Sequence, residues 1–291
     1  MLQLGYNTNG LPDLSATETI DLLSDIGYSG IAISLDRQVL NPFASGLRDE
    51  LQQVCRALTD RGLRCVIETG ARFLLDPNVK HEPTLVSGAP AARARRVEFI
   101  CRAIDTASEL GAECVSLWSG MVRDGAGHAE AMDRLAAGLI EVLEYAAAKM
   151  VVIAFEPEPD MFIDTMTSYA RLLDKLSSRS ANLAQLRLTL DVGHLHCQGE
   201  VPIADQIRRW GQQLVNVHIE DMRAGVHEHL MFGEGEIDFP PVIAALAEIR
   251  YAGLINVELS RHSQEGAAAA RRAYDFLRPI LDAANARHSE L

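Results

Sequence analysis

The stretch Arg187-Leu-Thr-Leu-Asp-Val-Gly-His194 is an apolar run that ends in a carboxylate, turns on a glycine and presents an imidazole three residues later. A buried parallel strand is expected to have this composition, and its carboxyl end is where a barrel strand delivers polar groups to the barrel mouth. Three other apolar runs each stop at one acid or imidazole: Val151-Val-Ile-Ala-Phe-Glu156, Leu214-Val-Asn-Val-His218 and Leu254-Ile-Asn-Val-Glu258. The repetition predicts four strands with polar groups at their carboxyl ends.

Short apolar runs alternate with helical patterns along the whole chain. The expected strands are 2–6, 30–34, 64–68, 113–118, 151–155, 186–190, 214–219 and 254–258. Eight strand-helix units without a linker are typical of a (β/α)8 barrel, here a single domain over residues 1–291. A doubly wound sheet is the competing architecture, but it would not place ligand-type residues at the ends of its last four strands alike.

Composition restricts the classes of partner. Hydrophobic residues at 48% and charged residues at 23% are ordinary for a soluble globular protein. No apolar run approaches the roughly 20 residues that cross a bilayer, and the start of the chain lacks the features of a signal peptide, so a cytoplasmic protein without a membrane partner is expected. The net charge of −13 argues against binding nucleic acid.

The four predicted strand ends carry Glu156, Asp191, His218 and Glu258. Three carboxylates and one imidazole favour a hard to borderline divalent ion, with Mn²⁺ first, Mg²⁺ or Co²⁺ next, and Zn²⁺ still an alternative. Any one of these acids could instead cap a helix, and His218 could be a hydrogen-bonded core histidine. Four such ends in succession favour a metal site over four separate structural roles.

Two long segments and one helix carry further expectations. Residues 69–90 form the longest irregular segment, and Lys80 and His81 make it locally cationic; it is either a solvated loop or a cover that contacts an anionic or polyhydroxylated ligand. Residues 220–237 are expected to be a loop. The helix expected over 91–110 should bury a face that carries Val97, Ile100, Cys101 and Ile104.

With Glu156, Asp191-x-x-His194, His218-x-x-Asp221 and Glu258 in this order, the chain resembles the sugar phosphate isomerase/epimerase family, whose barrel is xylose isomerase-like and endonuclease IV-like. The resemblance covers nearly the whole chain. It implies one metal ion at the four strand ends, with Glu156 and Glu258 also moving the proton and Asp191 and His218 serving as ligands only.

The resemblance also implies substrate contacts by His194 and Arg223, although Arg223 could equally be a surface arginine. Lys80, His81, Glu68 and His229 are further candidate substrate contacts. A homo-oligomer would agree with the habit of such families.

Related apurinic endonucleases bind three zinc ions through extra histidines at the ends of earlier strands. Here those strands end in Glu68 and in Leu117-Trp118, so these histidines are absent. His227 and His229 do match, by position, the extra ligand pair after the seventh strand, where the first member of that pair is an aspartate. Two alternatives stay open: a second metal ion held by Glu68, His227 and His229, or histidines that point into the substrate pocket or solvent.

The resemblance thus implies a divalent-metal isomerase or epimerase that acts on a small sugar, keto-sugar or polyol derivative through an enediolate. A dehydratase on a keto-polyol is the first alternative, because it begins with the same proton abstraction. A metal-dependent phosphodiester hydrolase and a non-catalytic sugar-binding barrel are the others.

Overall fold

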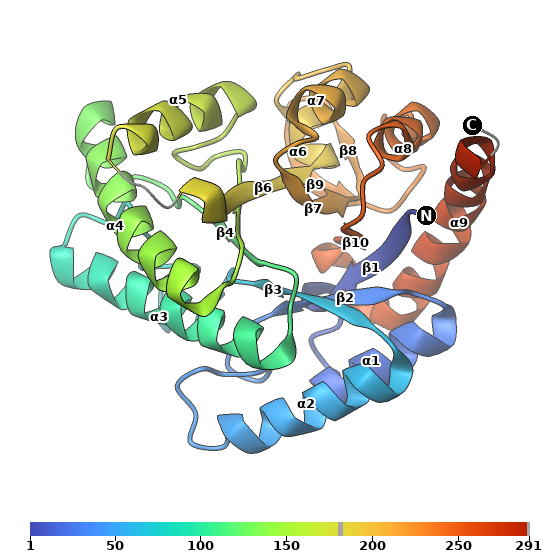
Figure 1. The fold of residues 1–291 in the computed structure, drawn as a ribbon, viewed down its shortest axis with the longest axis horizontal. Coiled ribbons are helices and arrows are strands. Elements are labelled where there is room, and N and C mark those ends of the chain that lie inside the picture. The colour runs from blue at the N-terminus through green and yellow to red at the C-terminus, as the bar shows by residue number, and fades with distance from the viewer. Residues whose placement is uncertain (180–182, 290–291) are drawn as a thin grey trace. The chain divides into compact units, whose positions relative to one another are not determined.

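The computed structural model describes residues 1–179 and 183–289. Eight parallel strands close into a barrel in the order β1-β10-β7-β6-β5-β4-β3-β2 (Figure 1). Their bounds are β1 (Gln3–Asn7), β2 (Gly30–Ser34), β3 (Arg64–Glu68), β4 (Val115–Trp118), β5 (Ile153–Glu156), β6 (Leu186–Asp191), β7 (Leu214–Ile219) and β10 (Leu254–Val257). The predicted (β/α)8 barrel is confirmed.

The helices follow the strands along the chain. Their bounds are α1 (Ala16–Ile26), α2 (Leu47–Arg61), α3 (Pro90–Leu110), α4 (His128–Lys149), α5 (Met166–Ser177), α6 (Val192–Cys197), α7 (Ile203–Trp210), α8 (Phe239–Glu248) and α9 (Gly266–Ser289). Local sequence sets their ends: Ser15 and Glu18 form a capping box at the start of α1, and Gly27 ends that helix with a φ of +115°. Across the described residues, no helix combines the length and the apolar character needed to cross a membrane.

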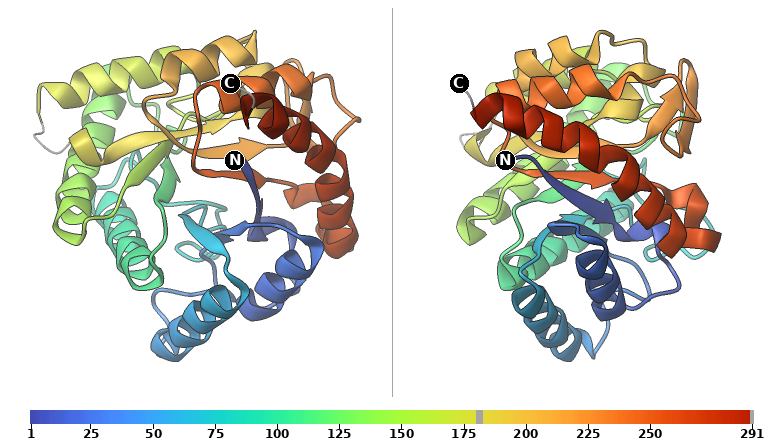
Figure 2. Two further views of the ribbon diagram at one scale, coloured as in Figure 1. Left: turned by 45° about the vertical axis from the view of Figure 1, so that its right-hand side comes forward. Right: turned by 90° about the vertical axis from the view of Figure 1, so that its right-hand side faces the viewer.

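The chain divides into two compact units. The first comprises residues 1–33, 56–65 and the described chain from 188 onward. In it, β1 pairs with β2 and β10, β10 with β7, and β7 with β6. Register places His218 on β7 opposite Asp191 on β6 and Asn256 on β10, which aligns the polar strand ends of this unit. Helices α8 and α9 lie side by side in it (Figure 2).

The second unit comprises residues 34–55 and 66–187 of the described chain. In it, β4 pairs with β3 and with β5, so that Ser116 lies opposite Glu68 and Trp118 opposite Glu156. Helices α3 and α4 pack side by side (Figure 1). The face that α3 buries includes Ile100 and Ile104 as predicted, but Val97 and Cys101 are only half-buried, while Arg96 and Phe99 are buried.

The segment 220–237 differs from the predicted loop, because it contains the antiparallel hairpin β8 (Asp221–Arg223) and β9 (Val226–Leu230). Gly225 turns the hairpin with a φ of +70°. The buried carboxylate of Asp221 accepts hydrogen bonds from the backbone N–H groups of Met222, Gly233, Gly235 and Ile237. One carboxylate therefore holds the chain after β9 against the start of β8.

Candidate active site

Asp191 is the last residue of β6 and also caps the short helix α6. Its Oδ1 accepts a hydrogen bond of 2.8 Å from the backbone N–H of His194. Its Oδ2 is buried, and no group among the described residues hydrogen-bonds to it. One oxygen of the carboxylate is therefore structural, while the other keeps its lone pairs for a ligand.

His218 and Glu258 face Asp191 from the neighbouring strands of the first unit. The Nδ1 of His218 lies 3.0 Å from Oε2 of Glu258 and 3.9 Å from Oδ2 of Asp191. The amide nitrogen of Asn216 lies 3.2 Å from the other ring nitrogen, Nε2, and this contact orients the ring so that Nδ1 faces the two carboxylates. Asn9 donates a hydrogen bond of 2.8 Å to Oε1 of Glu258. One ligand atom from each of Asp191, His218 and Glu258 lies within 4.8 Å of the others.

The imidazoles keep these carboxylates ionised. Burial acts to raise the pKa of Asp191, but the facing rings of His194, His229 and His218 outweigh it and hold this pKa below its usual value. Burial likewise acts to raise the pKa of Glu258, and the charge and hydrogen bond of His218 bring that pKa well below its usual range. Two adjacent carboxylates that stay ionised are suited to hold a divalent cation.

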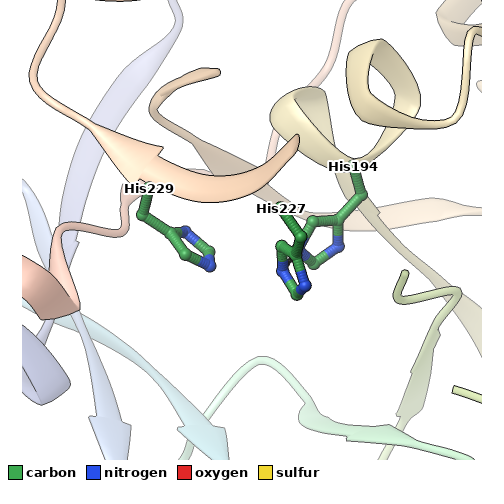
Figure 3. A group of neighbouring side chains, drawn as sticks. All are labelled: His194, His227 and His229. Atoms are coloured by element: carbon green, nitrogen blue, oxygen red, sulfur yellow. Dashed lines mark hydrogen bonds between the residues drawn. The ribbon is translucent and has the colours of Figure 1, made fainter. Parts of the chain in front are cut away.

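A second group of imidazoles adjoins Asp191. His194 lies on α6, whereas His227 and His229 lie on β9, and Figure 3 shows the three rings close together. Burial lowers the pKa of His194 to about 4, although Asp191 counteracts part of this effect. Burial also disfavours the charged form of His229, but the carboxylates of Glu220, Glu258 and Asp191 raise its pKa to about 10.

Glu220 is a member of this region that the sequence analysis missed. It follows β7 directly, is fully buried, and has its Oε2 3.8 Å from Nδ1 of His229. A Cβ atom at Gly193 would lie 2.0 Å from its Oε1, so the carboxylate occupies the space that this glycine leaves. An acid directly after a strand resembles a solvated loop residue in sequence, and only the glycine one position before His194 hinted at a close approach.

Arg223 is the last residue of β8. Its side chain is exposed, and its guanidinium donates a hydrogen bond of 2.9 Å to the backbone carbonyl of Glu234. This bond ties the arginine to the segment after the hairpin, which agrees with the surface role left open in the sequence analysis.

The remaining predicted residues belong to the second unit. Glu156 is buried at the end of β5, and Glu68 is buried at the end of β3. His81 is half-buried. Its Nδ1 forms a hydrogen bond with the carbonyl oxygen of Gly70, and its ring packs edge-on against the ring of Trp118. Lys80 is exposed. Within this unit the predicted residues are therefore two buried carboxylates, one exposed lysine and one half-buried imidazole whose pKa is lowered to about 4.

Comparison with known proteins gives one family and one consistent group of relatives. The family model described as "Xylose isomerase-like TIM barrel" matches residues 20–280. An uncharacterized protein of Methanocaldococcus jannaschii is 28% identical over 210 residues, which cover 64% of this chain and 68% of that protein. L-ribulose-5-phosphate 3-epimerase UlaE of Shigella flexneri serotype 5b is 26% identical over 218 residues, 74% of this chain and 75% of the enzyme.

Two solved structures share the fold. The 3-keto-D-glucoside 4-epimerase YcjR from E. coli superposes with a TM-score of 0.76 at 16% identity, over 96% of this chain and 100% of that one. An L-ribulose 3-epimerase superposes with a TM-score of 0.76 at 20% identity, over 99% of this chain and 97% of that one. The expectation of an isomerase or epimerase is confirmed at the level of these relatives, since those with a named activity are sugar epimerases.

Proposed function

Because the chain belongs to the xylose isomerase-like TIM barrel family, we propose that it is a divalent-metal-dependent epimerase of a small sugar, keto-sugar or polyol derivative. The observation that carries the proposal is the convergence of Asp191, His218 and Glu258 at adjacent strand ends, with a buried oxygen of Asp191 that no described residue hydrogen-bonds. The similarity to L-ribulose-5-phosphate 3-epimerase supports a sugar substrate and reaction at the carbon beside a carbonyl.

The donor set fits a divalent cation. Asp191 and Glu258 offer ionised oxygens, His218 offers an oriented ring nitrogen, and Glu156 is proposed as the fourth ligand because it ends β5 as Asp191 ends β6. Such a set suits Mn²⁺ first, and Mg²⁺, Co²⁺ or Zn²⁺ as alternatives. When bound, the ion would polarise the substrate carbonyl and stabilise negative charge on its oxygens.

The proton is proposed to move through the two glutamates. Glu258 is held by Asn9 and His218, and its lowered pKa keeps it in the deprotonated form that a general base needs. It would remove the proton from the carbon beside the carbonyl to form the enediolate, and Glu156 would return a proton to the opposite face. Inversion at that carbon follows when the two groups act on opposite faces of the substrate.

Substrate contacts are proposed for the polar residues around these ligands. His194 is the strongest of them, because it is buried and its Nε2 lies 3.7 Å from Oδ2 of Asp191. Glu68, Lys80, His81, Arg223 and His229 complete the proposed set. The whole of residues 1–291 is proposed to act as one catalytic domain.

Solvent deuterium exchange tests the proposal. The chelator-treated protein, reloaded with Mn²⁺, is incubated in D₂O with a panel of ketoses, ketose phosphates and keto-inositols. We expect metal-dependent deuterium at the carbon beside the carbonyl, together with the epimer. Exchange accompanied by loss of water would indicate the dehydratase instead, and no exchange with any substrate would contradict the proposed chemistry.

A further inference from the structure

Three polar side chains lie inside the first unit, each two residues before a proposed metal ligand. They are Thr189, Asn216 and Asn256, which precede Asp191, His218 and Glu258 in that order. All three are fully buried. We call them the polar belt. Because side chains alternate between the two faces of a strand, the belt residues on β6 and β7 share a face with the ligands on those strands.

Hydrogen bonds connect the polar belt to the imidazole of His218. The amide nitrogen of Asn256 donates a hydrogen bond of 2.8 Å to Oδ1 of Asn216. The amide nitrogen of Asn216 donates to Oγ1 of Thr189 at 3.3 Å and lies 3.2 Å from Nε2 of His218. Asn256 therefore determines which end of the Asn216 amide faces the imidazole.

The far end of the belt has an acceptor without a donor. Register places Gly5 on β1 opposite Asn256, and a Cβ atom at Gly5 would lie 2.0 Å from Oδ1 of Asn256. This oxygen is buried, and no residue in the described part of the chain hydrogen-bonds to it. A buried acceptor without a donor costs about 1–3 kcal/mol. The present orientation of the Asn256 amide is therefore not its best one.

The orientation of Asn216 also determines where His218 carries its proton. An amide nitrogen only donates, so Nε2 accepts and the ring proton lies on Nδ1, 3.0 Å from Oε2 of Glu258. A neutral ring that gives the lone pair of Nδ1 to a cation carries its proton on Nε2 instead, and this N–H needs an acceptor. The amide nitrogen of Asn216 cannot accept it, whereas the amide oxygen can.

We propose that Asn216 and Asn256 are positioning residues whose two amides reverse together when a cation binds Nδ1 of His218. A half-turn of a carboxamide exchanges an oxygen and an NH₂ group that occupy nearly the same space. The turned Asn216 offers its oxygen to the Nε2–H of His218. His218 is a ligand only under the proposed metal-dependent function, on which this inference rests.

The two amides are coupled because neither can turn alone. If only Asn216 turned, its NH₂ group would face the NH₂ group of Asn256, and two donors would meet. When Asn256 turns as well, its oxygen accepts a hydrogen bond from Asn216 and gains the donor that it lacks. Cation binding at His218 is therefore favoured by a residue that does not contact the imidazole.

Nitrogen NMR of the imidazoles reads the proton position without turnover. The full chain, labelled with ¹⁵N-histidine, is measured metal-free and with Zn²⁺, and the spectrum of His218→Gln identifies the signals of His218. We expect the proton on Nδ1 in the metal-free protein and on Nε2 in the zinc-loaded protein. Asn216→Asp, whose carboxylate oxygens only accept, should protonate Nε2 in the metal-free protein as well.

Zinc affinity in a chelator competition measures the coupling. Asn216→Leu, which is close in size, should lower the affinity about tenfold or more, because Nε2–H loses its acceptor. Asn256→Leu should lower it about two- to tenfold, the equivalent of one net hydrogen bond. The double variant should bind zinc as Asn216→Leu does, since Asn256 acts only through Asn216. Thr106→Val, which removes a buried hydroxyl on α3, is the matched control and should keep the wild-type affinity.

The same protonated nitrogen of His218 in metal-free and zinc-loaded protein would overturn the proposal. Losses of affinity that add in the double variant would overturn the coupling of the two amides while leaving the metal site in place. If Asn216→Leu does not fold, as judged by circular dichroism, Asn216→Asp replaces it in the cycle. A wild type that shows the expected proton shift but turns over no sugar would contradict the proposed epimerase activity alone, so the two proposals fail separately.

Discussion

Both units bury carboxylates at their strand ends, but the second unit also buries a guanidinium, that of Arg96 on α3. In the first unit, β6, β7 and β10 lead to Asp191, His218 and Glu258, and no described residue hydrogen-bonds to Oδ2 of Asp191. In the second unit, the region of β3 and β4 buries a guanidinium. Arg96 donates a hydrogen bond of 2.7 Å to the carbonyl of Thr69 and lies over the ring of Trp118 at 4.9 Å.

This difference shows that the barrel fold alone does not set the chemistry near a strand end, because that chemistry depends on the side chains placed there. The carboxylates of the first unit are proposed to hold a cation, whereas burial in the second unit lowers the pKa of Arg96 to about 10 because the charged form is poorly solvated. If this comparison is right, substitutions in the first unit should reduce chemistry and metal binding, and substitutions at the aromatic region of the second should reduce stability.

The largest effect is expected for Glu258→Gln. This change keeps the size of the side chain and an oxygen for Asn9 but removes the base, so kcat should fall by about 10² to 10⁴-fold. Turnover and deuterium exchange measure the loss, and circular dichroism should show an unchanged fold. Asn9→Ala, which removes only the hydrogen bond to Glu258, is the control and should cost much less. Full activity in Glu258→Gln would show that Glu258 is not the base, and would contradict the expectation that substitutions in the first unit reduce catalysis.

The next largest effect is expected for Arg96→Ala. Arg96 is 1% exposed and contacts Phe99 and Trp118, so truncation leaves a cavity and should lower the free energy of unfolding by about 3 kcal/mol. Arg96→Met should cost less than about 1 kcal/mol, because it fills most of the space and relieves the burial of a charge. Urea unfolding measures both. Equal losses in the two variants would show that the charge, and not the packing, supports this region.

The barrel strands could be predicted because each is a short apolar run between turn residues and because the polar residue that follows is conspicuous. The helix α6 could not, since its six residues are too few to show a helical period. The strands of the hairpin were missed because β9, Val226-His-Glu-His-Leu230, is largely polar and half-buried. Its pairing depends on β8, which no periodicity in the sequence reveals.

The candidate site shows the same limit. Asp191, His218 and Glu258 were predicted from their positions alone, and the structure brings them together. Glu220 and Arg96 were missed because acids and arginines are rarely buried, so their burial depends on tertiary surroundings. In Glu220 these include the space at Gly193, and in Arg96 they include the rings of Phe99 and Trp118.

A smaller effect should appear as pH dependence at His81. Burial, together with the charges of Lys80, Arg96 and Arg72, lowers the pKa of His81 to about 4, whereas an unfolded chain has the ordinary 6.5. The unfolded state therefore binds more protons between these values, and stability present above pH 6.5 is lost as the pH falls towards 4. At pH 5 the loss should be about 2 kcal/mol.

The variant His81→Gln should remove this part of the pH dependence. Urea unfolding of wild type and variant at pH 7.5 and pH 5 gives the difference, and His128→Gln, which changes an exposed histidine on α4, is the control. If the variant loses as much stability as the wild type on acidification, the cationic and aromatic surroundings of His81 do not act on its titration. The two units would then differ in the arrangement of their buried side chains but not in how those surroundings shift a pKa.

The smallest effect is expected for Lys80→Ala, which asks whether the cationic segment of the second unit acts on substrate. Lys80 is exposed, so a contact with an anionic substituent would be largely screened and worth less than about 1 kcal/mol. We expect KM for a phosphorylated sugar to rise by less than about fivefold with kcat unchanged, and KM for the unphosphorylated sugar to stay constant. Lys175→Ala, whose ammonium pairs with Asp133, is the matched control. An equal change in KM for both sugars, or no change for either, would show that residues 69–90 are a solvated segment that does not contact the anionic group. Recognition of the substrate would then depend on the imidazoles and carboxylates of the first unit.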